Sequence, residues 1–361
     1  MKITRFKIYR YNIALNRPVR IAQKHLTNRV GLILALGDDE NHVSFGEIAP
    51  LPGLHEETID DCLQQIALLK KKLLIKNDMD MPNEPPIEWT DQRIWAPSIQ
   101  FGVEAAYLNL ISMRQSILLP ELFSKKFHKT LTLNALLSGS HNTIIRSTQN
   151  ALSSHYHSLK LKVGTKSLNE DIQLTKEIAS LIKGKATLRL DANRSWNFDQ
   201  AIQFAKQTSN LPIDYIEEPL KDINQISQFF KMTHIPIALD ETLRYIDPDT
   251  YKIPVGIKSL VLKPSIIGDL AKIKKYHRLA MRNNIDVVYS DTFHSGVGLS
   301  YSTCLAASLM VKNVPIGLDT YQWLSQDLLV NKFVAKAGKL DVVKTAKNSA
   351  DIKFSLLHEI N

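Results

Sequence analysis

The sequence predicts an α/β barrel preceded by a smaller α+β domain. From residue 131 onward, eight short apolar runs recur at intervals of 22 to 30 residues, each followed by a helical pattern. A strand, a helix and two loops need about that many residues. The runs begin at Leu131, Leu159, Leu188, Tyr215, Ile237, Ser259, Asp286 and Ile316. Eight such units favour a closed parallel barrel. An open doubly wound sheet is the alternative, but no Gly-rich phosphate-binding turn follows any run.

The first part of the chain has a different pattern. Near-alternating apolar residues predict strands over 3–13, 31–36 and 43–48, with a turn at 37–39. Helices are expected over 56–76 and 98–113, separated by a loop that holds Pro82, Pro85, Pro86 and Pro97. We therefore expect a capping domain over 1–125, the barrel over 126–320, and a C-terminal segment over 321–361 that packs back on the capping domain.

One barrel helix shows its boundaries in the sequence. Ser167 and Glu170 form a capping box, and Gly184 ends the helix. The apolar stripe between them comprises Leu174, Ile178, Leu181 and Ile182.

Composition excludes several classes of protein. The 361 residues are 44% hydrophobic and 22% charged, which is typical of a globular enzyme and not of a disordered chain. No run approaches the ~18 apolar residues of a membrane span, and basic residues interrupt the N-terminus where a signal peptide needs an apolar core. The two cysteines, Cys62 and Cys304, cannot build a disulfide framework. We expect a cytoplasmic protein with no membrane partner.

The net charge of +9 is spread along the chain, with no zinc-finger spacing, Walker loop or RNP-type motif. We therefore expect no nucleic-acid partner. The excess positive charge suits an anionic small-molecule substrate. A monomer is compatible with these observations, which do not define the oligomeric state.

Charged residues end five consecutive barrel strands, where barrel enzymes carry their active sites. These residues are Lys160 and Lys162, Asp191, Glu217 with Glu218, Asp240 with Glu241, and Lys263. Three carboxylates on adjacent strands suit a hard octahedral cation, and the absence of His and Cys at these ends disfavours zinc. The lysines flank the carboxylates and would face each other across the barrel mouth.

This layout suits metal-assisted abstraction of a proton next to a carboxylate. A divalent ion can hold the substrate carboxylate and stabilise the enediolate that forms. A lysine becomes a base when a neighbouring cation lowers its pKa from ~10.4 toward neutrality. Lys160 and the metal are such neighbours of Lys162.

The same residues resemble a known family. The stretches GEIAPLPG (46–53), KLKVG (160–164), LRLDANRSW (188–196), IEEP (216–219), LDETLR (239–244), LKPSIIGDL (262–270) and PIGLDT (315–320) are similar to the muconate-lactonizing subgroup of the enolase superfamily, and within it to the o-succinylbenzoate synthases. The resemblance runs over nearly the whole chain. It implies a modified (β/α)7β barrel under an α+β capping domain, with bound Mg²⁺, or Mn²⁺ as an alternative.

The resemblance also implies roles for individual residues. Lys162 would take the α-proton and return it to the departing hydroxyl, Lys263 would stabilise the enediolate, and Lys160 would tune Lys162. Glu218 would be structural. The implied metal ligands are Asp191, Glu217 and Asp240.

The implied reaction is the dehydration of 2-succinyl-6-hydroxy-2,4-cyclohexadiene-1-carboxylate, a dicarboxylate, in menaquinone biosynthesis. Ser290 and Gly317 would lie near the succinyl group, and Asn193 joins them as a substrate-binding residue. Loops near 17–30 and 50–55 would close over the pocket. The run SDTFHSGVG (290–298) is less Ser-rich than the family implies, and its Asp291 and His294 have no assigned role.

Two other functions stay open. Flanking lysines also suit 1,1-proton transfer by an N-acylamino acid racemase or dipeptide epimerase of the same superfamily. Dipeptide epimerases typically carry Asp-x-Asp after the eighth strand, whereas here Asp319 is followed two places on by Tyr321. A barrel that binds a ligand without catalysis is the second alternative, and the intact set of acids and lysines counts against it.

Overall fold

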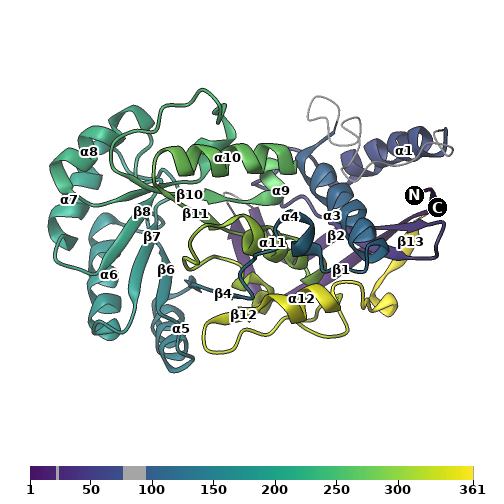
Figure 1. The fold of residues 1–361 in the computed structure, drawn as a ribbon. Coiled ribbons are helices and arrows are strands. Elements are labelled where there is room, and N and C mark those ends of the chain that lie inside the picture. Colours follow the sequence, from purple (N-terminus) through teal and green to yellow (C-terminus); the bar gives the residue numbers. More distant parts are fainter. Residues whose placement is uncertain (22–23, 76–94, 361) are drawn as a thin grey trace.

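The computed structural model describes residues 1–21, 24–75 and 95–360. Figure 1 shows a barrel joined to a second part made of long strands and helices, with both termini at the outer end of that second part. The predicted Pro82, Pro85 and Pro86 loop and the end of the first helix at Lys76 lie outside the described residues.

A four-stranded antiparallel sheet, in the order β13-β1-β2-β3, forms the first domain. Its strands are β1 (Ile3–Ile21), β2 (Lys24–Asp38), β3 (Val43–Ile48) and β13 (His358–Ile360). The first strand is longer than predicted. After an irregularity between Ala14 and Val19, β1 continues to pair with β2 as far as Ile21. Residues 17–21 and 24–30, expected as a loop, therefore lie in strands, because the two strands keep pairing to the tip of their hairpin.

Helices cover one face of this sheet. They are α1 (Ile59–Ile75) and α3 (Pro97–Arg114), and the short helix α4 (Leu119–Phe123) packs against α3 and α11. Gly46 of β3 and Gly102 of α3 let the sheet and the helix touch: a Cβ on Gly46 would lie 1.8 Å from the carbonyl oxygen of Gly102. A larger side chain at either position would clash with the opposite backbone or side chain. The helix α3 is buried along its length because it also packs against α4, α9 and α11.

Seven parallel strands form the barrel sheet, in the order β11-β10-β9-β8-β7-β6-β5. They are β5 (Ala135–Leu137), β6 (Ser158–Lys162), β7 (Thr187–Asp191), β8 (Ile213–Glu217), β9 (Ile237–Leu239), β10 (Ile257–Leu262) and β11 (Asp286–Tyr289). The predicted eighth strand is reduced to two bridges, which pair Gly317 with Ser290 and Ile316 with Leu133. These bridges join the two edges of the sheet, so the barrel closes as the sequence predicts.

The first predicted barrel run splits in two. Its N-terminal half is β4 (Thr130–Thr132), which leaves the barrel and pairs with β12 (Lys339–Asp341) in an antiparallel ribbon. Only its C-terminal half, β5, joins the barrel sheet. The partner strand comes from more than 200 residues further along the chain, so the local pattern carries no sign of it.

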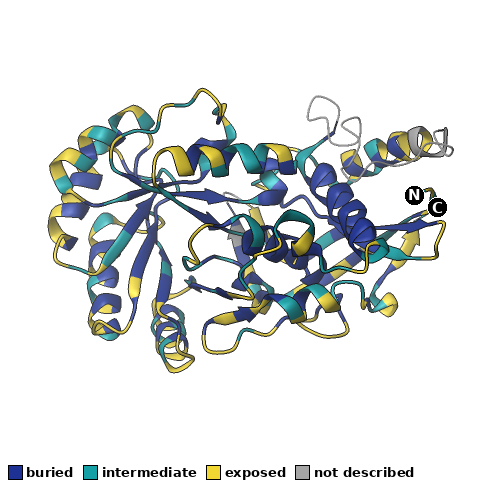
Figure 2. Ribbon diagram, in the orientation of Figure 1, coloured by how far each residue is buried: buried dark blue, intermediate teal, exposed yellow. Residues whose placement is uncertain are grey.

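The barrel helices turn their buried faces to the strands and their exposed faces outward (Figure 2). Ser167 and Glu170 form the predicted capping box, and the helix stops at Lys183 in the left-handed conformation, just before Gly184. The helices are α5 (His141–Ser153), α6 (Leu168–Ile182), α7 (Phe198–Thr208), α8 (Ile226–Thr233), α9 (Pro264–Ile267), α10 (Leu270–Arg282) and α11 (Gly296–Leu309).

The C-terminal segment contacts both parts of the molecule. Its β12 pairs with β4 beside the barrel, α12 (Val342–Asn348) packs against α11, and β13 pairs with β1 at the edge of the first domain. This segment joins the two parts rather than forming a third. The borders at 125/126 and 320/321 stay predictions.

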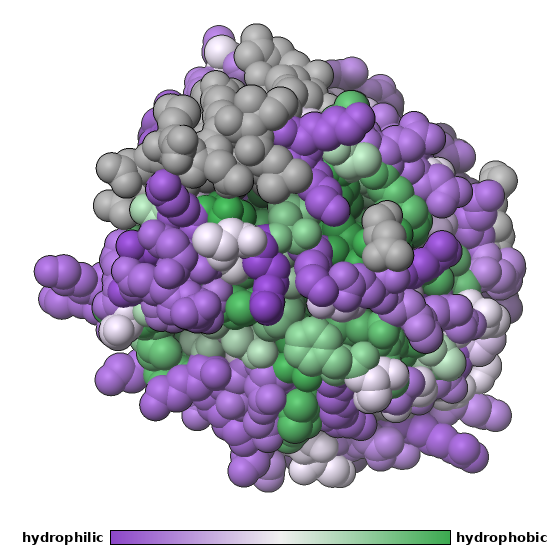
Figure 3. Space-filling view, turned by 90° about the vertical axis from the view of Figure 1, so that its right-hand side faces the viewer, coloured by the Kyte–Doolittle hydropathy of each residue, from purple (hydrophilic) through white to green (hydrophobic). Residues whose placement is uncertain are grey.

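No helix in the described ranges is long and apolar enough to cross a membrane. Figure 3 shows one face of the molecule, on which hydrophilic side chains surround a smaller group of exposed hydrophobic ones.

Candidate active site

The candidate catalytic side chains lie at the carboxyl ends of adjacent barrel strands. Lys162 ends β6, Asp191 ends β7 and Glu217 ends β8. The parallel register sets Lys162 opposite Asp191 and Asp191 opposite Glu217. Register partners point to the same face of a sheet, so these side chains form one row. Lys160, two residues before Lys162, shares that face.

Lys160 is clamped between two carboxylates. Its Nζ lies 3.1 Å from Oδ2 of Asp191 and 2.8 Å from Oε2 of Glu217, and it donates a 2.9 Å hydrogen bond to Oε1 of Glu217. The three side chains are 12%, 10% and 1% exposed, so water screens them little. Removing the charge of Lys160 would leave two buried carboxylates uncompensated.

A second ion pair lies across the barrel mouth. Asp240 directly follows β9 and Lys263 directly follows β10, and Nζ of Lys263 contacts Oδ2 of Asp240. Three strands separate β6 from β10 in the sheet order. Lys160 and Lys263 therefore approach the carboxylates from opposite sides, as expected from the order of the strands in the sequence.

The charges of this cluster shift one another's pKa values. Burial, then the negative charges of Asp191 and Asp240, raise the pKa of Glu217 well above its usual range. Burial alone would lower the pKa of Lys160, but the carboxylates of Asp191 and Glu217 outweigh it and raise that pKa. The lysines in turn hold the pKa of Asp191 below its usual value against the effect of burial. The cluster therefore favours additional positive charge.

The donor set fits a hard divalent cation. The candidate ligands Asp191, Glu217 and Asp240 offer only carboxylate oxygens, all at the strand ends, and Oε2 of Glu217 is buried without a hydrogen bond, although it lies within ion-pair distance of Lys160. In the described part of the chain no three Asp, Glu, His or Cys side chains are arranged as a ligand set. The ammonium groups of Lys160 and Lys263 instead lie against the carboxylates, and their side chains must move for a metal to bind.

Lys162 differs from the other two lysines. Its side chain is partly exposed at the barrel mouth, and among the described residues its ammonium makes no hydrogen bond or ion pair. Its charge nevertheless helps to lower the pKa of Asp191, its register partner. An amine that is close to the cluster but not held by it can reach a substrate.

Glu218 supports the cluster from behind. It is buried with a positive φ of 42°, which turns its side chain away from that of Glu217. Its Oε1 accepts hydrogen bonds from the backbone N–H groups of Asp240 (2.9 Å) and Thr242 (2.7 Å), and its Oε2 pairs with Nε of Arg194 at 3.0 Å. These contacts agree with the structural role expected for Glu218 and fix the backbone of Asp240.

Asn193 is bonded to Glu241, a strand-end residue to which the sequence analysis gives no role. Its amide nitrogen donates a 2.8 Å hydrogen bond to Oε1 of Glu241, so its role in substrate binding stays a prediction. Burial raises the pKa of Glu241, as do the charges of Asp240 and Asp191. Glu241 is thus a fourth carboxylate at the mouth, and its position directly after Asp240 is the signal in the sequence for this place.

Ser290 and Gly317 lie side by side on the closing strands. They pair through a parallel bridge, and a Cβ on Gly317 would lie 3.2 Å from Oγ of Ser290. The structure thus brings together the two residues predicted near the succinyl group. It does not test their contact with a substrate.

A cavity of about 320 Å³ connects the strand ends to the first domain. Asp240, Val261 and Lys263 line it on the barrel side, and Leu54 and His55 line it on the first-domain side. Burial lowers the pKa of His55 to about 3, and its Nε2 lies 3.1 Å from the carbonyl of Ser265. His55 is therefore a neutral contact between the two domains, from the predicted 50–55 loop.

Buried contacts between the domains escaped the sequence analysis. Arg29, on β2, donates to the carbonyl oxygens of Ala49, Pro50 and Phe293. An apolar cluster joins the same regions and comprises Val19, Ile21, Leu51, Phe293 and Trp323. The cluster residues come from four separate segments, so no local pattern signals that they meet at the barrel mouth.

Comparison with known proteins places this site in a family. Residues 143–346, more than half of the chain, match the family model described as enolase C-terminal domain-like, and residues 3–110 match the MenC N-terminal domain. The o-succinylbenzoate synthase of Klebsiella pneumoniae (strain 342) is 30% identical over 326 residues, which cover 90% of this chain and 92% of that protein. The chloroplastic protein PHYLLO of Arabidopsis thaliana is 28% identical over 84% of this chain, but the match spans only 20% of PHYLLO.

Solved structures share the fold. The muconate lactonizing enzyme from Pseudomonas fluorescens, complexed with muconolactone, has a TM-score of 0.82 at 19% identity and covers 94% of each chain. The dipeptide epimerase from Cytophaga hutchinsonii, complexed with Mg and a dipeptide, has a TM-score of 0.83 at 20% identity and covers 100% of this chain and 99% of its own. These likenesses show the fold. The family models and the curated relatives show the family: the chain belongs to the o-succinylbenzoate synthases, a family of lyases in the enolase superfamily.

Proposed function

We propose that the protein is a Mg²⁺-dependent o-succinylbenzoate synthase of menaquinone biosynthesis. Its reaction is the syn dehydration of 2-succinyl-6-hydroxy-2,4-cyclohexadiene-1-carboxylate. The observation that carries the proposal is the row Lys162, Asp191 and Glu217, with Lys263 and Asp240 across the mouth. The 30% identity to a curated synthase over 90% of the chain supports it.

Asp191, Glu217 and Asp240 would hold the metal. When bound, the divalent ion supplies positive charge next to the substrate carboxylate as the α-proton leaves. Lys160 and Lys263 neutralise these carboxylates in the structure. Metal binding therefore requires the two lysine side chains to move away from the carboxylates or to share them with the metal.

Lys162 is the proposed acid and base. Its partly exposed ammonium is close to Asp191 but not bound to it. In its neutral form the amine takes the α-proton of the substrate. The resulting ammonium then protonates the hydroxyl that leaves from the same face. Lys160, two residues earlier on the same face of β6, is the residue proposed to tune Lys162.

Lys263 and the closing strands complete the site. Lys263 approaches from the opposite side and stabilises the negative charge that develops on the substrate carboxylate. Ser290 and Gly317, which lie side by side, are the proposed contacts of the succinyl group. The substrate carries two carboxylates, which agrees with the net charge of +9.

Racemisation or epimerisation is the second candidate, because the structural match to a dipeptide epimerase extends over the whole chain. One contact disfavours a dipeptide substrate. Oδ2 of Asp319 accepts a 2.6 Å hydrogen bond from the hydroxyl of Tyr156, and Tyr321 stands where a second Asp would be expected. Oδ2 of Asp319 is thus already bonded, and Tyr321 offers no carboxylate to help bind a substrate ammonium.

The test compares two substrates on the same Mg²⁺-loaded protein. Dehydration of the cyclohexadiene is followed by loss of its absorbance, and α-proton exchange of N-succinylamino acids is followed in deuterated water. The proposal expects a much larger kcat/KM for the first, and its loss on addition of EDTA. Exchange without dehydration would mean that the catalytic groups are correct and the substrate is wrong.

A further inference from the structure

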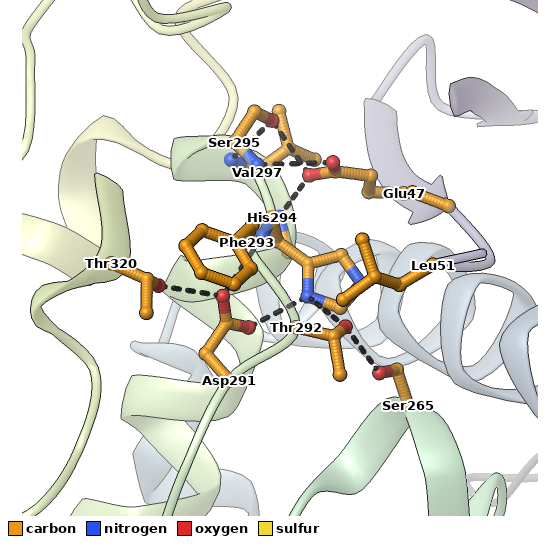
Figure 4. Close-up of polar contacts among 12 residues, drawn as sticks. Glu47, Leu51, Ser265, Asp291, Thr292, Phe293, His294, Ser295, Val297 and Thr320 are labelled. Carbon is orange, nitrogen blue, oxygen red and sulfur yellow. Dashed lines mark hydrogen bonds and ion pairs between the residues drawn. The ribbon is translucent and has the colours of Figure 1, made fainter. Parts of the chain in front are cut away.

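The loop after β11 carries a buried acid–imidazole pair that the proposed mechanism does not use. Nδ1 of His294 lies 2.6 Å from Oδ1 of Asp291, and the backbone N–H of His294 donates to Oδ2 of Asp291 at 2.8 Å. Both side chains are only 1% exposed (Figure 4). Burial would raise the pKa of Asp291, but its interactions with His294 and the hydrogen bond from Thr320 outweigh burial and hold that pKa below its usual value.

This pair is not part of a nucleophilic triad. Nε2 of His294 is buried and has no hydrogen-bond partner within the described ranges, so it activates no hydroxyl or thiol. The contact with Asp291 instead indicates that the ring proton lies on Nδ1, where a carboxylate accepts it. The pair therefore acts on the position of the loop rather than on a reacting atom.

Asp291 ties together the two segments that hold the proposed succinyl contacts. It directly follows Ser290, and its Oδ2 accepts a 2.8 Å hydrogen bond from Oγ1 of Thr320, three residues after Gly317. Figure 4 shows Asp291 between Thr320 and His294. The hydrogen bond between Asp291 and Thr320 thus supports the Ser290–Gly317 bridge. Asp291 is one residue beyond Ser290, and Thr320 is three residues beyond Gly317.

The other end of the loop is anchored to the first domain. Ser295 donates its backbone N–H and its hydroxyl to the two carboxylate oxygens of Glu47, at 3.0 and 2.6 Å. The ring of His294 lies 5.1 Å from that of Phe101 in α3, centroid to centroid. The loop between Asp291 and Ser295 is therefore held at both ends, and the His294–Asp291 contact transmits that anchoring to Ser290.

We propose that Asp291 and His294 are positioning residues that hold Ser290 against Gly317 and so set the subsite for the succinyl group. The inference rests on the proposed function, because it assigns the subsite to that substrate. It adds that the shape of this subsite depends on the buried hydrogen bond between Thr320 and Asp291. Neither Asp291 nor His294 needs to touch the substrate.

Matched variants separate this role from simple support of the fold. Thr320→Val removes the hydroxyl that binds Asp291 and keeps the shape of the side chain, whereas Thr320→Ser keeps the hydroxyl. His294→Asn places an amide N–H where Nδ1 lies, whereas His294→Gln places it at the Nε2 position and leaves Oδ1 of Asp291 without its side-chain donor. In each pair one variant breaks the brace and the other retains it.

The measurement is steady-state turnover of the cyclohexadiene by the Mg²⁺-loaded enzymes, together with Mg²⁺ titration and thermal unfolding. Loss of a buried hydrogen bond to a charged group corresponds to roughly a tenfold effect or more. We expect Thr320→Val and His294→Gln to raise KM about tenfold, with kcat and the Kd for Mg²⁺ within about twofold of wild type. Thr320→Ser and His294→Asn should stay near wild type.

Three results would overturn the inference. Equal KM values in the two members of each pair would show that the brace does not set the subsite. A fall in Tm and in kcat with KM unchanged would show a purely structural role. A wild-type protein that binds Mg²⁺ but does not turn over the cyclohexadiene would remove the proposed function, and this inference with it.

Discussion

Lys162 on β6 is the register partner of Asp191 on β7. The pairing places a lysine that binds no other described residue directly beside a buried carboxylate that is itself bound by Lys160. One strand, β6, thus presents two lysines to the same face with different roles. Lys160 neutralises the cluster, and Lys162 remains available to a substrate.

The backbone of Asp240 depends on the carboxylate of Glu218. Glu218→Ala would leave the buried N–H groups of Asp240 and Thr242 without an acceptor and Arg194 without its partner. We expect the free energy of unfolding to fall by roughly 3 kcal/mol, measured by urea unfolding. Glu218→Gln keeps an oxygen for both N–H groups and should lose about 1 kcal/mol. Equal losses of unfolding free energy in the two variants would show that Glu218 does not fix the backbone of Asp240 through these hydrogen bonds.

Asp240 is the proposed metal ligand nearest to Lys263. Asp240→Asn keeps the shape of the side chain but removes its negative charge, so the Kd for Mg²⁺ should rise more than ~10-fold in calorimetric titration. Asp249→Asn is the matched control, because Asp249 is 44% exposed and pairs with Lys275 away from the barrel mouth. An unchanged Kd in Asp240→Asn would show that the ligand set is wrong.

Asp319 should make stability depend on pH. Burial raises its pKa from 3.8 to about 6. Between these values the unfolded chain loses the proton while the folded protein keeps it, so stability falls as pH rises from about 4 to 6. Relative to Asp319→Asn, the wild type should lose roughly 3 kcal/mol of unfolding free energy over this range. Urea unfolding at pH 4, 5, 6 and 7 measures the difference, and parallel profiles would contradict the assignment.

The sequence predicts the barrel and its charged strand ends because both depend on short-range patterns. Apolar runs that end in Lys162, Asp191 or Glu217 place these residues at one end of a parallel sheet whatever the packing around it. The capping box of Ser167 and Glu170 is equally local, and the structure confirms it.

Features that depend on distant segments could not be predicted in this way. The first barrel run splits because β12 pairs with β4, and β1 is long because its hairpin with β2 keeps pairing. The same holds for the site. Arg29 is hydrogen-bonded to Phe293, 264 residues away in the sequence, and Thr320 is hydrogen-bonded to Asp291, 29 residues away. No periodicity in the sequence links the members of either pair.

The central claim is that Lys162 moves the proton in a metal-dependent dehydration. The most direct measurement compares wild type with Lys162→Ala in the cyclohexadiene assay, with Mg²⁺ binding by both proteins verified by calorimetry. Loss of a general acid–base group lowers the rate by about 10²–10⁴-fold. The account predicts a loss at the upper end of this range or beyond, because one residue serves as both base and acid, with Mg²⁺ affinity retained. Turnover by a Mg²⁺-loaded Lys162→Ala protein within about tenfold of wild type would contradict it.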